Sequence, residues 1–288
     1  METRPLGDTG HGSSVVTLGA YALQYLTHEG ANHLVELAVD RGVTHVDVAP
    51  TYGDAELKLG PKLNEHRDQL FLGCKTRERD YEAARAELDR SLARMGVEQI
   101  DLYQFHAVTH HDEIDRITAE DGALRAVREA QAEGLVDHVG LTSHGHPDVV
   151  ADAMDRLDLS SVMFPFNYVL EGSEDPAHDF GRLVEKANRE NVGVIGTKAF
   201  ARGPWPDEAP RRDRPYGTWY RPVETQAEIQ DCLDFALSRG VTTITNPGDP
   251  KLVTMVLNAG ENHEAMSEDR QADLMARDRE SPVPAPDV

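Results

Sequence analysis

Four side chains that can hold or transfer a proton lie in three short segments within the first 106 residues of the chain. The segment HVDVAPTYG contains Asp47 and Tyr52, FLGCKT contains Lys75, and LYQFH contains His106. A lysine beside a phenol stabilises the phenolate, which lowers the tyrosine pKa from about 10 towards neutrality. Such a phenol can exchange a proton with an alcohol or carbonyl oxygen, which is general acid–base chemistry.

Each of these residues also has a purely structural explanation. Asp47 and Lys75 could form an ion pair, because a lysine in an apolar strand needs a charged partner. Tyr52 could be an aromatic residue at the rim of a sheet, and His106 a hydrogen-bonded core histidine. The catalytic interpretation therefore depends on whether the surrounding elements bring all four side chains to neighbouring strand ends.

Short apolar runs alternate eight times with amphipathic helical segments. The predicted strands are Val15–Leu18, Val43–Val48, Leu70–Lys75, Leu102–His106, His138–Thr142, Val162–Phe166, Val192–Thr197 and Val241–Thr245. The predicted helices include Asn32–Asp40, Tyr81–Met95, Ala123–Glu133, Asp148–Arg156, Asp179–Glu190 and Gln226–Arg239. Such alternation indicates parallel strands joined by right-handed crossovers. Eight units in 288 residues predict an α/β protein with a single closed (β/α)8 TIM barrel.

The alternative is an open, doubly wound sheet, but no GxGxxG motif follows the first predicted strand. Glycines 42, 96, 134 and 240 follow predicted helices and are expected to end them with a positive φ. We expect the barrel to span residues 1–280 and a proline-rich, extended tail to span 281–288. Barrel active sites lie at the carboxyl ends of the strands, where the four candidate residues would meet.

The composition excludes several classes of protein. The chain has 51 Asp and Glu against 29 Lys and Arg, and a net charge of −22 repels nucleic acids and anionic membranes. It has neither a long apolar run nor the pattern of a signal peptide, so we expect a soluble, cytoplasmic protein. Lysine is scarce, and this together with the excess of acid favours a halophilic source; an ordinary acidic protein is the alternative.

The two cysteines exclude a disulfide framework, and strand alternation places Cys74 in the helix layer, as packing rather than as a nucleophile. Histidines 110, 111, 144 and 146 raise the alternative of a metal-dependent barrel hydrolase or lyase. A barrel metal site needs several ligands that converge from different strands, whereas most of these histidines lie in acidic loops. We therefore predict no metal.

The segment 201–225 after the seventh predicted strand is rich in proline, arginine and aromatic residues. It is either a surface excursion or, because it follows a barrel strand, part of the substrate site. Under the second interpretation, Trp205, Tyr216 and Trp219 are candidates to stack on a sugar or an aromatic ring. The acidic surface disfavours anionic substrates.

Six motifs occur in the order expected of one family: RPLGDTGHGSSVVTLG, GVTHVDVAPTYGDAE, FLGCKT, SLARMGVEQIDLYQFH, GLVDHVGLTSHG and NVGVIGTKAFARG. Over almost its whole length the chain resembles the aldo-keto reductases, and the first motif is similar to their N-terminal β-hairpin. The resemblance implies that Tyr52 is the general acid, that Lys75 and Asp47 tune it, and that His106 orients the substrate carbonyl. It also implies that hydride comes from a nicotinamide cofactor.

The resemblance implies a cofactor site in the second half of the chain. The candidate cofactor-binding residues are Thr142, Ser143, Asn167, Lys198, Gly248, Lys251 and Asn258. Where the family often carries cations for the adenosine 2′-phosphate, this chain has Gly248, Asp249 and Thr254, which favours NAD(H). Lys251 or a loop arginine could replace those cations, so NADP(H) and NAD(H) both stay open.

We therefore interpret the chain as an NAD(P)(H)-dependent oxidoreductase that interconverts a small aldehyde or ketone and the corresponding alcohol. We expect a monomer or a small homo-oligomer that binds neither nucleic acid nor membrane. Two alternatives stay open. One is a cofactor-binding regulatory or redox-sensing barrel without efficient turnover, and the other is the metal-dependent hydrolase or lyase.

Overall fold

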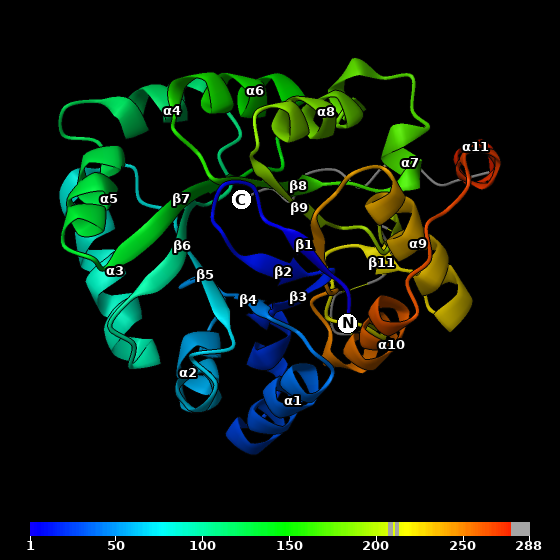
Figure 1. Ribbon diagram of the computed structural model, residues 1–288, viewed down its shortest axis with the longest axis horizontal. Helices are drawn as coiled ribbons and strands as arrows, with labels where there is room; N and C mark the ends of the chain where they lie inside the picture. Colours follow the sequence, from blue (N-terminus) through cyan, green and yellow to red (C-terminus); the bar gives the residue numbers. More distant parts are fainter. Residues whose placement is uncertain (207–209, 211–212, 278–288) are drawn as a thin grey trace.

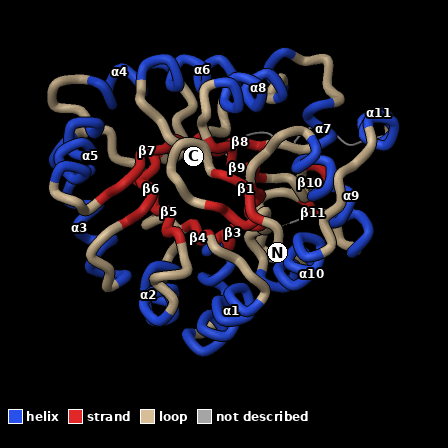
Figure 2. Tube along the Cα trace, in the orientation of Figure 1, coloured by secondary structure: helices blue, strands red, loops and turns tan. Residues whose placement is uncertain are grey.

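A computed structural model describes residues 1–206, 210 and 213–277. Eight parallel strands close into a barrel in the order β12-β3-β4-β5-β6-β7-β8-β9, surrounded by helices (Figures 1 and 2). The strands are β3 (Val16–Gly19), β4 (His45–Asp47), β5 (Phe71–Thr76), β6 (Ile100–Phe105), β7 (Val136–Thr142), β8 (Ser161–Pro165), β9 (Gly193–Thr197) and β12 (Thr243–Thr245). Each predicted strand overlaps one of these, and the predicted (β/α)8 barrel is confirmed.

Helices follow the barrel strands and cover the outside of the sheet (Figure 1). They are α1 (His28–Asp40), α2 (Ala55–Glu65), α3 (Tyr81–Met95), α4 (His111–Thr118), α5 (Ala123–Ala132), α6 (Pro147–Arg156), α7 (Tyr168–Glu171), α8 (Gly181–Arg189), α9 (Gln226–Ser238), α10 (Pro250–Glu261) and α11 (Glu268–Ala276). A short 3-10 helix, η1 (Ala20–Tyr25), follows β3, and η2 (Pro176–His178) precedes α8. Six helices match their predicted segments, and Gly42, Gly96, Gly134 and Gly240 have the expected positive φ.

An N-terminal hairpin closes the amino end of the barrel. Strands β1 (Thr3–Pro5) and β2 (Gly12–Ser14) pair antiparallel and lie across the centre of the view in Figure 1. Leu6 packs in a small cluster with Phe71, the first residue of β5, and His11 stacks on the same ring at 4.4 Å. The hairpin covers the amino end of the barrel, and a ligand site is expected at the carboxyl ends of the strands.

A large apolar core fills the space between the sheet and the helices. Cys74 and Cys232 are both buried in it, and burial raises the pKa of each thiol far above its usual range. Both residues therefore serve as packing, as the alternation of strand residues predicts for Cys74. Across the described residues, no helix has the length and apolar content to cross a bilayer.

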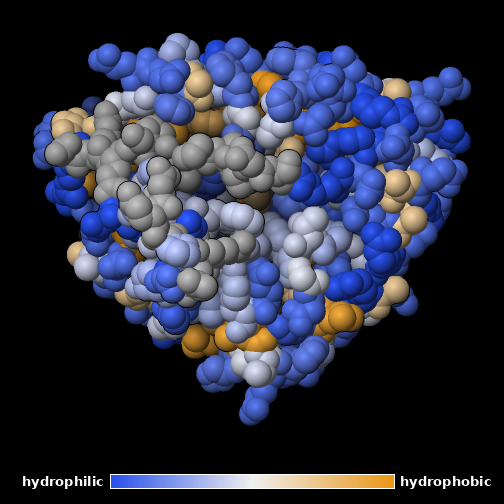
Figure 3. Space-filling model, turned by 180° about the vertical axis from the view of Figure 1, so that it is seen from behind, coloured by the Kyte–Doolittle hydropathy of each residue, from blue (hydrophilic) through white to orange (hydrophobic). Residues whose placement is uncertain are grey.

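The segment after β9 forms a second small hairpin, β10 (Ala201–Gly203) with β11 (Arg221–Pro222). Residues 207–209 and 211–212 of this segment lie outside the described residues, as does the predicted tail 281–288. Figure 3 views the molecule from the side opposite to Figure 1, and this side carries mostly hydrophilic side chains.

Candidate active site

A cavity of about 330 Å³ lies at the carboxyl end of the barrel. All eight barrel strands contribute a residue at or near their carboxyl ends to its wall, namely Gly19, Asp47, Arg77, His106, His144, Met163, Thr197 and Thr245. Tyr52 lines the same cavity from the turn after β4. The cavity therefore occupies the place where this fold gathers functional side chains.

Lys75 and Asp47 form a buried ion pair on adjacent strands. Lys75 is fully buried, and its Nζ donates to Asp47 Oδ2 and, at 3.1 Å, to the Val48 carbonyl. Gln104 Nε2 donates to the second carboxylate oxygen, Asp47 Oδ1, at 2.8 Å. Burial by itself lowers the pKa of Lys75, but Asp47 and Tyr52 raise it above its ordinary value overall. The ammonium is therefore charged at neutral pH, and its predicted partner is the observed one.

Tyr52 lies next to this pair, in the turn that leads from β4 into α2. Lys75 Nζ is 5.0 Å from the centre of the phenol ring, and the His106 ring centre is 6.0 Å away at 84°. We predicted that Lys75 lowers the pKa of Tyr52, but the structure shows a net increase. Burial raises that pKa more than the ammonium lowers it, and Asp47 adds to the increase. The phenol is therefore protonated at neutral pH.

His106 follows β6 directly, and its backbone N–H donates to the Thr76 carbonyl at 2.7 Å. Burial, together with the charge of Lys75, holds the pKa of the imidazole well below its usual range. The ring is therefore neutral, and its Nδ1 is buried without a hydrogen-bond partner among the described residues. A neutral imidazole can donate one hydrogen bond to a substrate oxygen but is a poor source of protons.

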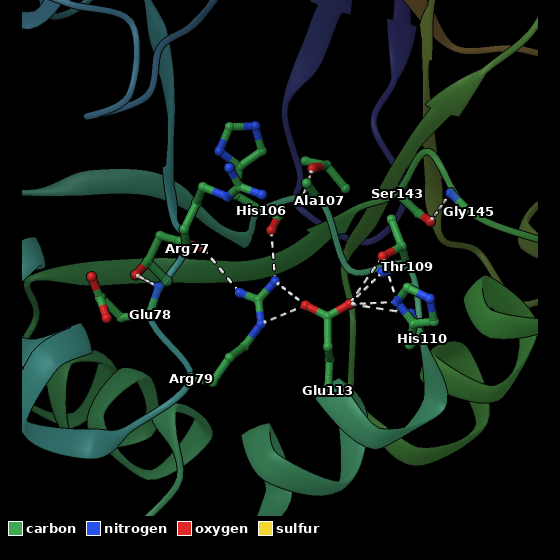
Figure 4. Close-up of polar contacts among 12 residues, drawn as sticks. Arg77, Glu78, Arg79, His106, Ala107, Thr109, His110, Glu113, Ser143 and Gly145 are labelled. Atoms are coloured by element: carbon green, nitrogen blue, oxygen red, sulfur yellow. Dashed lines mark hydrogen bonds and ion pairs between the residues drawn. The ribbon is translucent and has the colours of Figure 1, made fainter. Parts of the chain in front are cut away.

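The loops that carry these residues are tied to each other. Arg79 Nη2 donates to the His106 carbonyl and to Glu113 Oε1, both at 2.8 Å (Figure 4). Glu113 Oε2 also accepts from the backbone N–H groups of Thr109 and His110, at 2.7 and 3.1 Å. These bonds join the loop after β5 to the loop after β6, so that His106 is held in place by its neighbours.

Two of the predicted cofactor residues, Lys198 and Gly248, lie in the cavity wall. Lys198 has a left-handed φ of 54°, and burial lowers its pKa to about 8. Thr142 and Ser143 lie behind the wall, where their hydroxyl oxygens accept from Ala107 N at 2.8 Å and Gly145 N at 3.0 Å. Each hydroxyl keeps a proton that it can donate.

The other predicted cofactor residues do not line this cavity and make contacts within the protein. Asn167 caps α7 through its Oδ1 and donates from Nδ2 to the Lys198 carbonyl at 2.9 Å. Lys251 Nζ donates to the Pro215 carbonyl at 2.9 Å. Asn258 Oδ1 accepts from Arg41 at 2.8 Å. In each case the polar group already has a partner in its own neighbourhood.

Asp249 has a structural role that the sequence did not indicate. Its Oδ1 accepts from Lys251 N at 2.9 Å and caps the start of α10, while Oδ2 accepts from Gly217 N at 2.8 Å. The same carboxylate therefore holds the segment 213–222 against the helix. Gly248 beside it leaves no room for a side chain, because a Cβ there would lie 2.5 Å from the Tyr21 ring.

Of the predicted substrate residues, only Trp219 lines the cavity. It is 52% exposed, and its ring centre is 6.2 Å from that of Tyr21, another wall residue. Trp205 packs within its own segment, where Nε1 donates to the Thr218 carbonyl at 2.9 Å. Tyr216 lies under Lys251, 5.9 Å from its Nζ. The aromatic segment therefore contributes to the cavity, but through fewer side chains than expected.

The histidines considered as metal ligands are dispersed. His146 caps α6, His111 bonds to Asp152 at 2.8 Å, and only His144 lines the cavity. Burial lowers the pKa of His144 to about 3. Among the described residues, the one cluster with three potential ligands is Glu36, Glu65 and His66, and none of its members lines the cavity.

Sequence reasoning missed Arg77 and Tyr21, which both line the cavity. Arg77 stands two positions after Lys75, on a strand whose alternate side chains face the same way, so the spacing could have indicated it. Tyr21 lies in η1, and no periodic pattern points to it.

Known proteins with similar sequences are oxidoreductases. D-threo-aldose 1-dehydrogenase from a Pseudomonas species is 28% identical over 229 residues, which cover 66% of this chain and 66% of that protein. The NAD/NADP-dependent indole-3-acetaldehyde reductase of Schizosaccharomyces pombe is 26% identical over 230 residues, or 78% and 76% of the two chains. The match to the oxidoreductase YqkF of Bacillus subtilis, at 26% identity over 58% of this chain, spans 56% of that protein's length.

A solved structure with a similar fold is the holo form of an aldo-keto reductase from Bacillus halodurans. It superimposes with a TM-score of 0.73 over 96% of this chain and 97% of that one, at 20% sequence identity. The family model described as "Aldo/keto reductase family" matches residues 15–259, which include every barrel strand and the whole candidate site. This chain therefore belongs to the aldo/keto reductase family.

Proposed function

We propose that the protein reduces an aldehyde or ketone to the alcohol with NADH or NADPH, and that Tyr52 donates the proton. The observation that supports this most is the geometry of the site. The Lys75 ammonium, held by Asp47, is 5.0 Å from the centre of the Tyr52 ring, and the His106 ring centre is 6.0 Å from it. The pKa directions agree with this arrangement, because they leave Lys75 charged, His106 neutral and the phenol protonated at neutral pH. A reductase needs these three states before the reaction begins.

In the proposed reaction the substrate carbonyl oxygen accepts hydrogen bonds from the Tyr52 hydroxyl and from the His106 imidazole. The bound cofactor supplies a hydride to the carbonyl carbon. As negative charge grows on the oxygen, Tyr52 gives up its proton, and the O–H bond of the alcohol forms while that of the phenol breaks. Lys75, 5.0 Å from the ring centre, stabilises the phenolate until it regains a proton.

The cavity wall is compatible with a nicotinamide nucleotide. Such a ligand carries phosphate, ribose and amide groups, which need cationic and hydroxyl partners. The wall offers the Lys198 ammonium together with the Thr197 and Thr245 hydroxyls. The name of the S. pombe relative includes both NAD and NADP, which supports this class of cofactor without choosing between the two.

The choice of cofactor depends on Asp249. The family resemblance places the adenosine 2′-phosphate near residues 248–254, where this chain has a carboxylate at the start of α10 instead of cations. A like charge there repels an extra phosphate, which supports NAD(H). Lys251, two residues further on, carries a positive charge that could attract the 2′-phosphate, so NADP(H) stays an alternative.

Titration of the purified protein with NADH and NADPH separately, followed by nicotinamide fluorescence, tests the proposal. Turnover of simple aldehydes and ketones is then measured with whichever cofactor binds. We expect saturable binding and carbonyl-dependent oxidation of the cofactor. Tight binding with no turnover of any carbonyl would indicate the regulatory barrel instead, and the absence of binding would contradict the oxidoreductase function.

We also propose that the protein works as a soluble cytoplasmic enzyme in concentrated salt. The net charge of −22 supports this, because salt screens the repulsion between surface carboxylates. The expected result is a free energy of unfolding that is higher in 2 M KCl than in 0.1 M KCl, measured by urea denaturation. A lower value in 2 M KCl would contradict the adaptation to salt.

A further inference from the structure

The charge of the cavity wall differs from that of the rest of the molecule. The chain carries 51 acidic residues, yet among the residues that the structure describes the only carboxylate in the wall is Asp47, whose charge is matched by Lys75. Arg77 and Lys198 also line the cavity. Within the described residues, the wall is therefore locally cationic inside a strongly anionic protein.

Arg77 lacks the carboxylate partner that most described arginines of this chain have. Arg79, for example, pairs with Glu113, and Arg85 pairs with Glu133. In the part of the chain that the structure describes, the Arg77 guanidinium makes no hydrogen bond or ion pair. A planar fork of five N–H donors thus faces a cavity with no acceptor assigned to it.

Hydrogen bonds to Glu87 hold the backbone that carries the Arg77 side chain. Arg77 N donates to Glu87 Oε2 at 3.2 Å, and Thr76 Oγ1 donates to the same oxygen at 2.8 Å. The Arg79–Glu113 pair holds the other side of the loop. In Figure 4 the Arg77 side chain runs towards His106 and away from this pair. The nearby carboxylates are therefore engaged in holding the loop, and the guanidinium is left at the catalytic end of the cavity.

Arg77 follows β5, and in the closed barrel this strand lies opposite β9, after which Lys198 stands. His106 and Tyr52, which contact the carbonyl in the proposed reaction, line the same cavity as Arg77. The Arg77 charge contributes to the lowered pKa values of His106 and His144, in agreement with its position beside both rings.

We propose that the substrate carries an anionic group, a carboxylate or a phosphate, which the Arg77 guanidinium binds while the carbonyl oxygen lies against Tyr52 and His106. The planar fork of arginine matches both anions with two parallel hydrogen bonds. This inference rests on the proposed carbonyl reduction. It also reverses the expectation that the acidic surface disfavours anionic substrates. The field of the whole surface mainly changes the rate at which a substrate reaches the protein, whereas a close ion pair stabilises the bound complex.

The test compares matched pairs of substrates that differ in charge. 4-Formylbenzoate is compared with the neutral 4-formylbenzamide, and glyceraldehyde 3-phosphate with glyceraldehyde, which separates carboxylate from phosphate. For at least one pair we expect wild-type kcat/KM to be about 10- to 100-fold higher for the anion, mainly through KM, because charge-assisted hydrogen bonds are the strong ones.

The Arg77→Gln variant is expected to remove most of this ratio, and Arg77→Lys to keep part of it, because lysine retains the charge but not the fork. Arg189→Gln is the matched control. Arg189 is exposed on α8 and also makes no bond among the described residues, so its variant is expected to keep the wild-type ratio. Binding of the unreactive terephthalate and of terephthalamide, measured by calorimetry, gives a readout that does not need turnover.

Two failures are distinguishable. If neutral carbonyls are reduced as well as anionic ones, or if Arg77→Gln weakens cofactor binding and leaves the anion ratio intact, the role of Arg77 is wrong and the reductase stands. If no carbonyl is reduced but terephthalate binds in an Arg77-dependent way, the proposed reduction is wrong and the anion site stands.

Discussion

Replacement of Lys75 by methionine tests both the stability and the chemistry of the site. Lys75 is fully buried and Asp47 is 2% exposed, so the variant leaves a carboxylate inside the protein with only the Gln104 amide as a partner. Breaking a buried ion pair from one side costs about 3–5 kcal/mol of the free energy of unfolding. We expect a loss of that size in urea denaturation at pH 7.

The same variant removes the charge that stabilises the phenolate of Tyr52. A unit charge 5.0 Å from the ring centre contributes about 3 kcal/mol at an effective dielectric constant of about 20. Since each 1.4 kcal/mol is about a factor of ten, kcat for reduction is expected to fall about 100-fold. The rate is measured with saturating cofactor and a simple aldehyde.

The double variant Asp47→Asn/Lys75→Met separates the two effects. It removes both charges, so we expect stability to recover by about 2 kcal/mol relative to Lys75→Met, whereas the rate stays low. A deficit of Lys75→Met below about 1 kcal/mol at pH 7 would refute our account of the pair.

Three further predictions concern the proton donor and the cofactor. Tyr52→Phe is expected to lower kcat by at least about 1000-fold while cofactor affinity, measured by fluorescence, changes less than about twofold, because the phenol acts only in the chemical step; retention of most of the rate would exclude Tyr52 as the acid. Burial raises the pKa of Tyr52 above its usual value near 10, so kcat for reduction should stay flat from pH 6 to 9 and fall only in stronger alkali, whereas alcohol oxidation, which needs the phenolate, should rise with pH. A fall in the reduction rate between pH 7 and 8 would contradict this order. Asp249→Asn keeps one oxygen for the helix cap but removes the charge and the acceptor for Gly217 N, and should raise the ratio of NADPH to NADH affinity about tenfold, measured by separate titrations; an unchanged ratio would remove Asp249 from cofactor selection.

The sequence predicted where the candidate catalytic residues lie, because strand ends determine where side chains go. Asp47 ends β4 and His106 follows β6 directly, so the location of each strand also located the residue. Lys75 needed a charged partner in an apolar strand. Of the two carboxylates on the adjacent strands, Asp47 ends β4, whereas Asp101 lies at the amino end of β6, away from Lys75. The fold was predictable for the same reason, since eight regular alternations admit few arrangements.

The cofactor-binding part of the site was less predictable, because single positions were compared with the family pattern without knowledge of what each side chain contacts. Asn167 and Lys251 are polar residues at plausible positions, yet their hydrogen bonds go to backbone groups of the protein itself. Whether a polar side chain serves a ligand or its own neighbourhood depends on partners that are distant in the sequence. The pKa of Tyr52 was mispredicted for a related reason, because its burial outweighs the effect of the lysine beside it.

The net charge of the chain likewise does not predict the charge of the cavity wall. The carboxylates of this chain stand largely on helices, where Glu87 and Glu113 bind the loop after β5 and orient it. The side chains inside the barrel come from the strands instead. They include Lys75 on β5, and Arg77, which directly follows β5, lines the cavity. An acid-rich protein can therefore present an anion-binding wall, because the fold separates the residues that keep the surface hydrated from those that face the substrate.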